Sequence, residues 1–553
     1  MTFRLCAASR AAALLLASTV LGCNLEEGLR KTPTVLSPDE VAAIEGPGKR
    51  LLAGNFHGLT TRWGRLVMRK VDGPKNTLVS VDPQHESSCE LENAERFAYA
   101  STGWVAYSDA ASNFTEIHFA AEDCTALPAV VSNASMPYDV TEDGEAVMVI
   151  GSALVAVDPV TEQRRVLADP YTSVQQLGSR DQKGYVWLVK QGDQFIEFDW
   201  NWKELSRVGE KVGGLAFVSS PPTLAFEDNG KLNRMSVDAD GKLSISLIAE
   251  DGCRPRTASS TNFAYLSPCN EPTLHTVSGR GTDVDWGALG VQPEQAVALP
   301  KGTSGIQLLF LRDIDPNVGT GSLWLLDAPG GEPQKLAEHA DLGWVQAAKD
   351  DSIYALVDIE NDLGKVVHFA KDGSTEELVT EVPRNGNNQF YYGRQFWFFA
   401  HPQSDGTSEL VRICALASCD GNAGAPAVQS IARGVPDWGF ASALDSNHVA
   451  VLHDVSKGRG TLSTDSGALV AEGVPQGGFA ALYPIMKQGI AYLTHYDSER
   501  AVGTLEYWNL ELDARGTVAE NVSEFMRADW PYMGIVYLVP SGDNAGLWYA
   551  RGK

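Results

Sequence analysis

The chain has 553 residues, of which 44 are Lys or Arg and 70 are Asp or Glu, so its formal net charge is −26. This length exceeds the size at which one hydrophobic core stops growing, which predicts more than one domain. The negative charge disfavours nucleic acids and anionic membrane surfaces as partners.

The N-terminus has the pattern of an export signal. Arg4 and Arg10 flank the start of an apolar run, residues 11–21, which is too short to span a bilayer as a helix but suits a signal peptide. No other part of the chain has an apolar run of membrane-spanning length.

The apolar run ends in Val20-Leu21-Gly22-Cys23, which resembles the lipobox of bacterial lipoproteins. The resemblance implies cleavage after residue 22, lipidation of Cys23 and a protein anchored in the cell envelope by lipid alone. The Asn24 that follows favours the outer membrane under the enterobacterial sorting rule. The alternative is an ordinary secretory signal, and either signal exports the protein.

Residues 23–48 are predicted to form a tether that contains one short helix. Ser37-Pro38-Asp39-Glu40 supplies a helix N-cap, a Pro at the first helical position and a capping-box Glu before the apolar residues 41–44.

From Leu51 onward the sequence predicts strands only. An apolar run that ends in a polar residue or Pro recurs, and from Asp313 on its end points lie 42 to 52 residues apart. A period of this length in an all-strand sequence is typical of propeller blades. The clear runs are 104–109, 308–313, 353–358, 396–401, 448–453, 490–495 and 535–540, and the fainter ones are 66–68, 146–149, 185–188, 223–226 and 263–266.

These twelve runs are interpreted as the second strands of twelve four-stranded antiparallel blades. A Gly-x-Leu sequence at Gly321, Gly460 and Gly503 introduces the third strand of its unit. The last run, Gly546–Ala550, has the pattern of a third strand, so its blade lacks an outer strand within the C-terminal sequence. We expect an N-terminal segment such as Thr32–Leu36 to supply it, because an open sheet edge invites aggregation.

Twelve blades exceed the usual four to eight of one ring, which favours two propellers. The least regular unit lies between Cys253 and Pro300. The boundary is therefore predicted there, giving a first propeller over 49–300 and a second over 301–553. Six plus six blades is the preferred division, and seven plus five is the alternative.

Three segments resemble known propeller repeats. Residues 141–149, Thr-Glu-Asp-Gly-Glu-Ala-Val-Met-Val, resemble the blade motif of TolB-like and WD40-like propellers, and residues 154–161 resemble the repeat of quinoprotein-type propellers. Ser463-x-Asp465-x-Gly467 resembles part of a sialidase Asp-box, which in that family stabilises a turn. These resemblances imply the fold and not a function.

The mature sequence has six cysteines besides Cys23. An even number in an exported chain favours disulfides, and Cys-x4-Cys without a nearby His suits zinc poorly. Proximity in sequence favours three pairs, which are Cys89 with Cys124, Cys253 with Cys269, and Cys414 with Cys419.

Residues at equivalent strand ends are the candidates for a binding face. The predicted repeat places Asp313, Asp358, His401, His453 and His495 on one face of the second ring. Neighbouring blades hold equivalent atoms too far apart for one shared metal, so turn-making aspartates and hydrogen-bonded histidines are the expected roles. Acidic loops at Asp313 and Asp358 do not complete an EF-hand pattern.

The sequence contains no recognisable catalytic set and no motif for a cofactor or metal. It therefore favours a lipid-anchored propeller that binds or scaffolds a protein, peptide or glycan of the cell envelope without catalysis. The alternative is an exported propeller enzyme that acts on glycans as a hydrolase or lyase, with carboxylates near the ring axis.

Overall fold

The structure is a computed structural model. It describes residues 43–552 except 63–64, 73–76, 83–86, 100–103, 110–114, 122, 178–184, 220, 238–241, 303–304, 348–350, 385–390, 393–395, 403–406, 415–427, 437–440, 445–447, 483–484, 487 and 529–533. The proposed lipidation site Cys23 and nearly all of the predicted tether helix lie outside the described residues.

The described residues form twelve four-stranded antiparallel sheets, which we number as blades along the ring. Blades 1 to 6 are β2–β5 (Phe56–Arg62, Arg65–Lys70, Leu78–Asp82, Ser87–Leu91), β6–β9 (Ala94–Tyr99, Trp104–Asp109, Glu116–Ala121, Ala126–Ser132), β10–β13 (Asp139–Val140, Ala146–Ile150, Ala153–Val157, Arg164–Ala168), β14–β17 (Ser173–Leu177, Val186–Gln191, Gln194–Phe198, Glu204–Val208), β18–β21 (Val212–Ser219, Pro222–Asp228, Lys231–Val237, Leu243–Ala249) and β22–β25 (Cys253–Thr257, Asn262–Ser267, Thr273–Ser278, Asp283–Asp285).

The remaining six blades have the same order of strands, with one exception at the end of the chain. Blades 7 to 12 are β26–β29 (Ala296–Lys301, Gly305–Arg312, Gly321–Leu326, Gln334–Ala340), β30–β33 (Val345–Ala347, Ile353–Glu360, Leu363–Phe369, Thr375–Pro383), β34–β37 (Tyr391–Tyr392, Phe396–Pro402, Ser408–Cys414, Val428–Val435), β38–β41 (Ala441–Ala443, Val449–Ser456, Arg459–Thr464, Leu469–Pro475), β42–β45 (Phe479–Ala481, Gly489–Asp497, Val502–Asn509, Ala514–Val522) and β46–β48 with β1 (Glu524–Ala528, Gly534–Val539, Gly546–Arg551, Lys49–Ala53). Two short 3-10 helices, η4 (Pro293–Gln295) and η5 (Leu342–Trp344), lie in connections between blades.

All twelve predicted second strands are second strands in the structure. Each blade packs between two neighbours, so its second strand is covered on both faces. This is why β47 is buried along its whole length and β43 over its first six residues. Outer strands such as β9 bury only some of their side chains and give a weaker sequence signal.

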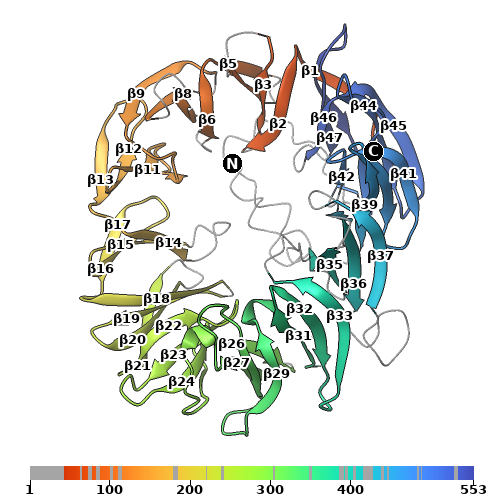
Figure 1. Cartoon of the computed structure of the whole chain (residues 1–553). Helices are drawn as coiled ribbons and strands as arrows, with labels where there is room; N and C mark the ends of the chain where they lie inside the picture. The colour runs from red at the N-terminus through yellow and green to blue at the C-terminus, as the bar shows by residue number, and fades with distance from the viewer. Residues whose placement is uncertain are drawn as a thin grey trace, which may run out of the picture.

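The blades follow chain order around a single ring (Figure 1). Leu266 of blade 6 and Leu308 of blade 7 share one buried cluster with Trp286, so packing continues across the predicted boundary. The prediction of two rings separated between Cys253 and Pro300 is therefore wrong. The irregular spacing there arises because β25 has only three residues and η4 follows it before the next blade begins.

The ring closes by pairing the two ends of the described chain. β1 pairs antiparallel with β48, so an N-terminal strand completes the last blade as predicted, but it is Lys49–Ala53 and not Thr32–Leu36. Phe56 and Leu66 of blade 1 then pack against Val536 and Leu538 of blade 12. Residues 49–53 consequently belong to the last blade and not to an N-terminal propeller.

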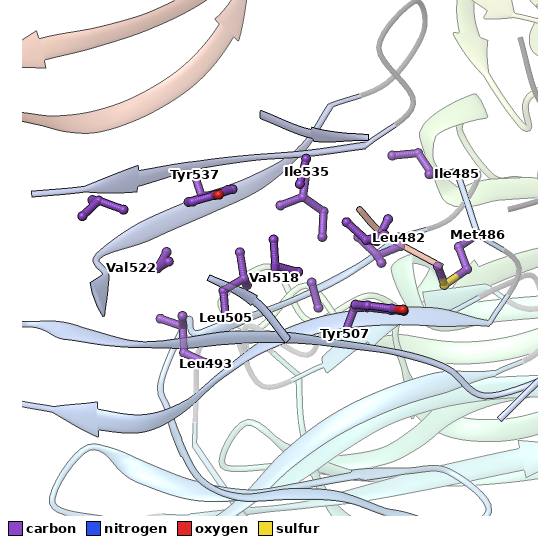
Figure 2. Close-up of a cluster of buried hydrophobic side chains, with 14 residues drawn as sticks. Leu482, Ile485, Met486, Leu493, Leu505, Tyr507, Val518, Val522, Ile535 and Tyr537 are labelled. Carbon is purple, nitrogen blue, oxygen red and sulfur yellow. The ribbon is translucent and has the colours of Figure 1, made fainter. Parts of the chain in front are cut away.

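The core consists of similar apolar layers between adjacent blades. Figure 2 shows the layer between blades 11 and 12, where Leu493 and Leu505 face Ile535 and Tyr537. Ile44 joins this layer and forms a β-bridge with Gly552, so the chain is docked on the ring before β1 begins.

The Gly-x-Leu sequences have a steric explanation. A Cβ atom at Gly321, Gly460 or Gly503 would lie 2.6, 2.5 or 2.8 Å from a carbonyl oxygen of the second strand, which is closer than real Cβ contacts. Gly364 occupies the same place in blade 8. The register of the third and fourth strands shifts next to each of these glycines.

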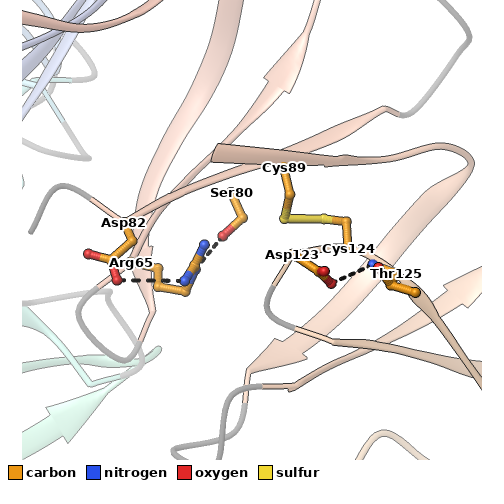
Figure 3. The surroundings of a disulfide bond; sticks show 7 residues. All are labelled: Arg65, Ser80, Asp82, Cys89, Asp123, Cys124 and Thr125. Atoms are coloured by element: carbon orange, nitrogen blue, oxygen red, sulfur yellow. Dashed lines mark hydrogen bonds and ion pairs between the residues drawn. A yellow bond between two sulfur atoms is a disulfide. The ribbon is translucent and has the colours of Figure 1, made fainter. Parts of the chain in front are cut away.

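Two of the three predicted disulfides are formed. Cys89–Cys124 joins the outer strand of blade 1 to a turn of blade 2, and Cys253–Cys269 lies within blade 6, with Cα atoms 5.5 and 5.9 Å apart. Figure 3 shows Cys124 in a turn that Asp123 holds by accepting a 2.9 Å hydrogen bond from the Thr125 amide. Cys419 lies outside the described residues, so the third pair stays a prediction.

Candidate functional site

The predicted binding-face residues lie at or next to the ends of second strands, where each hairpin turns toward the third strand. Asp313, Asp358 and His495 each follow the last regular residue of a second strand and adopt left-handed φ values of 53°, 51° and 47°. Their side chains are exposed. Asp tolerates this conformation because its short side chain bonds locally. Asp358 and His495 lie where the register of their hairpin shifts, and Asp313 lies in a bend.

His453 does not occupy the equivalent position in blade 10. The left-handed residue there is Asp454, with φ of 51°, and His453 is the last regularly paired residue before it. The side chain of His401 lies outside the described residues, although its backbone belongs to β35. The sequence pattern therefore located the strand ends but misassigned one residue by a single position.

Asp358 and His453 each make their contacts within their own blade and not with one another. Asp358 forms an exposed ion pair with Lys365, which also pairs with Glu377, at 3.6 and 3.1 Å. The hydrogen bond from Lys365 to Glu377 raises the pKa of the Lys365 ammonium. Such exposed pairs contribute little to stability.

His453 has the most specific chemistry of the set. Its Nδ1 atom lies 2.7 Å from Asp454 Oδ2, and its Nε2 atom lies 3.0 Å from Ser463 Oγ. The His453 side chain is 18% exposed and that of Asp454 is 68% exposed, whereas Ser463 is 8% exposed. A carboxylate can only accept a hydrogen bond, so Nδ1 donates to Asp454 and Nε2 accepts from the Ser463 hydroxyl.

The pairing register of β39 and β40 creates this contact. His453 pairs with Thr461 and Val451 pairs with Ser463, so His453 and Ser463 are diagonal neighbours on one face of the blade. Spacing alone does not reveal such a diagonal pair, because it depends on where the hairpin turns. His453 and Ser463 belong to two separate sequence patterns, the strand ends and the Asp-box resemblance, and neither pattern places them together.

Asp465, the central residue of the Asp-box resemblance, has a local structural role. Its carboxylate is buried and accepts a 3.2 Å hydrogen bond from the Val449 amide, while its other oxygen lies 3.4 Å from His448 Nδ1. It thereby ties the turn after β40 to the start of β39.

Two further features were not predicted. In blade 6, His275 stacks on Tyr265, and its two ring nitrogens lie 3.4 and 3.7 Å from carboxylate oxygens of Asp283 and Asp285. Between the outer parts of blades 8 and 9, a groove of about 290 Å³ is lined by Glu377, Leu378, Val379, Thr380, Glu409, Val411, Val428 and Ser430. The His275 contacts depend on strand pairing and the groove depends on blade packing, so no local sequence motif predicts either feature.

Within the described residues, no three His, Cys, Asp or Glu side chains are grouped so that they could hold a metal ion. In the same part of the chain, no helix has the length and apolar character needed to cross a membrane.

Neither a family model nor a curated protein matches the sequence. Similar solved structures include a eukaryotic initiation factor, with 8% identity over 71% of this chain and 90% of that chain and a TM-score of 0.30. TolB from Acinetobacter baumannii has 12% identity over 55% of this chain and 81% of that chain, with a TM-score of 0.22. The WD40 domain of SCAP from fission yeast has 8% identity over 74% of this chain and 95% of that chain, with a TM-score of 0.22. Likenesses at this level carry no argument about function. The sheet topology of the chain itself establishes that it is a propeller.

Proposed function

We propose that this protein is exported, anchored in the outer membrane through lipid on Cys23, and used as a binding platform in the cell envelope. The lipobox resemblance supports the anchor, and two disulfides suit an oxidising compartment. The closed ring supports a binding role because it holds many loops on a rigid frame.

The observation that carries the proposal is the charge of one set of loops. The hairpin ends that join second and third strands in blades 7, 8, 10 and 11 occupy equivalent positions, and their exposed charged side chains are mostly acidic. The exposed acids are Asp313, Asp315, Asp358, Glu360, Asp362, Asp454, Asp497 and Glu499, against the exposed bases Lys457 and Arg500. Such a surface favours a protein or peptide with basic residues over an anionic glycan.

Site-specific photocrosslinking in cells would test this face. A photoreactive residue at position 360 or 499 should capture a partner, because both positions are exposed on the loops. The matched control positions are Val166 and Leu205, which are 62% and 52% exposed on the outer strands of blades 3 and 4. Capture from the outer strands alone would contradict the proposed face.

Charge removal would then test the recognition chemistry. Replacing Glu360, Asp362 and Glu499 by the matching amides should weaken capture of the partner. Raising the salt concentration should weaken capture by the wild type, and it should weaken capture by the variant to a smaller extent. Equal capture by both proteins at low salt would show that acidic complementarity is not the basis of binding.

A further inference from the structure

We propose that Ser463, His453 and Asp454 form a serine nucleophile site that reacts with small esters or other activated acyl compounds. This inference is independent of the binding role of the loops. It rests on a chain of two contacts, from Ser463 Oγ to His453 Nε2 at 3.0 Å and from His453 Nδ1 to Asp454 Oδ2 at 2.7 Å. A hydroxyl bonded to a base that a third group orients is the arrangement of an activated nucleophile.

The propeller fold does not require this trio. The two positions that hold His453 and Ser463 hold Thr494 and Glu506 in blade 11, where Thr494 Oγ1 donates a 2.9 Å hydrogen bond to Glu506. In blade 7 they hold Arg312 and Trp324, which make a cation–π contact at 5.0 Å. Of these three pairs, the one in blade 10 joins a hydroxyl to a general base.

The exposure of the three residues limits the size of the substrate. Asp454 lies at the loop surface and the side chain of His453 is 18% exposed, whereas Ser463 is 8% exposed. Because Ser463 is buried, a substrate must present a slender acyl or phosphonyl group, and a folded protein is excluded.

The reaction follows from the direction of these hydrogen bonds. Ser463 Oγ forms a bond to the acyl carbon as its proton passes to His453 Nε2, and Asp454 stabilises the resulting imidazolium. The C–O bond to the alcohol breaks, and the alcohol leaves with the proton from His453. Water then attacks the acyl-serine, gives a proton to His453 and releases the acid, and the proton returns to Ser463.

A fluorophosphonate probe tests the nucleophile directly, because Ser463 Oγ would form a P–O bond as fluoride leaves. With the full-length purified protein, we expect labelling that peptide mapping assigns to Ser463 and that Ser463→Ala abolishes. His453→Gln should slow labelling by about 100-fold or more, which is the usual contribution of a general base. Absence of labelling on Ser463 in the wild type would overturn the proposal.

Further variants separate chemistry from folding. Ser322→Ala is the matched control, since Ser322 is a buried third-strand serine bonded to Glu338 at 2.8 Å, and it should label like the wild type. Asp454→Asn keeps a residue that tolerates the left-handed conformation. It should slow labelling at an unchanged melting temperature, and Asp454→Glu should retain more of the rate. Equal labelling rates in wild type, His453→Gln and Asp454→Asn would show that Ser463 is not activated.

Discussion

Gly503 shows how one missing side chain sets the geometry of a blade. A Cβ atom there would lie 2.8 Å from the carbonyl oxygen of Thr494. Ala usually stabilises a strand relative to Gly, but here the overlap must force the two strands apart. We expect Gly503→Ala to lower the free energy of unfolding by about 1–3 kcal/mol. Urea titration would measure the change in the free energy of unfolding. Thr504→Ala is the control for a substitution at the neighbouring position. A Gly503→Ala protein as stable as the wild type would contradict the steric explanation.

Cys23 decides where the protein is located if the lipobox resemblance holds. Cys23→Ser removes the thiol that would be acylated, so we expect the variant to leave the membrane fraction. Fractionation with detection of the protein would measure this. Cys253→Ser, which removes the Cys253–Cys269 disulfide and not the anchor, serves as the control for loss of a cysteine elsewhere. Recovery of Cys23→Ser in membranes at the wild-type level would contradict lipidation.

His275 makes the stability of blade 6 dependent on pH. Burial alone would lower the pKa of His275, but the nearby carboxylates of Asp283 and Asp285 outweigh the effect of burial, and the net pKa is raised. The charged imidazole therefore stabilises the folded state. This contribution is complete below the unfolded-state pKa of about 6.5 and is lost as pH rises through the higher folded-state value.

The corresponding experiment compares melting temperatures of wild type and His275→Gln between pH 5.5 and 8.5. We expect the wild type to exceed the variant most at the acidic end, with the difference shrinking as the pH rises. His495→Gln is the control, because His495 is exposed near the end of β43. A difference that grows with pH would show that the neutral imidazole is the stabilising form.

At the scale of strands, what the sequence predicts depends on burial. Second strands such as β47 are buried on both faces, so their apolar runs are visible without knowledge of their neighbours. The glycines at 321, 460 and 503 also predict a real feature, because each meets a carbonyl of the same hairpin. The His453–Ser463 contact was not predictable, since it arises from a diagonal register across a bulged hairpin.

The strand β1 provides a prediction at this scale. It supplies the outer strand of blade 12, and without it the edge of β48 is open. A protein that begins at residue 54 should therefore aggregate or unfold at a lower urea concentration than one that begins at residue 43. Size-exclusion chromatography and urea titration would compare the two. Equal behaviour would mean that closure by β1 is dispensable.

The number of rings could not be predicted from the repeats. In the described part of the chain, the buried clusters join neighbouring blades, so the local pattern is the same whether a ring closes after six blades or after twelve. Closure is decided by the surfaces of blades 6, 7, 12 and 1. Leu266 packs against the cluster that contains Leu308, and Leu538 packs against the cluster that contains Leu66.

Dividing the chain between blades 6 and 7 gives a test of the single ring. In one ring, residues 43–288 and 289–553 each expose two apolar blade faces, and the second fragment also lacks β1. We therefore expect each fragment alone to aggregate or to unfold without cooperativity, and co-expression to restore a soluble complex. Chromatography and thermal unfolding of the separate and combined fragments would measure this. Two rings would instead give two monomeric fragments, each unfolding cooperatively near the melting temperature of the intact chain, and that result would contradict closure between blades 12 and 1.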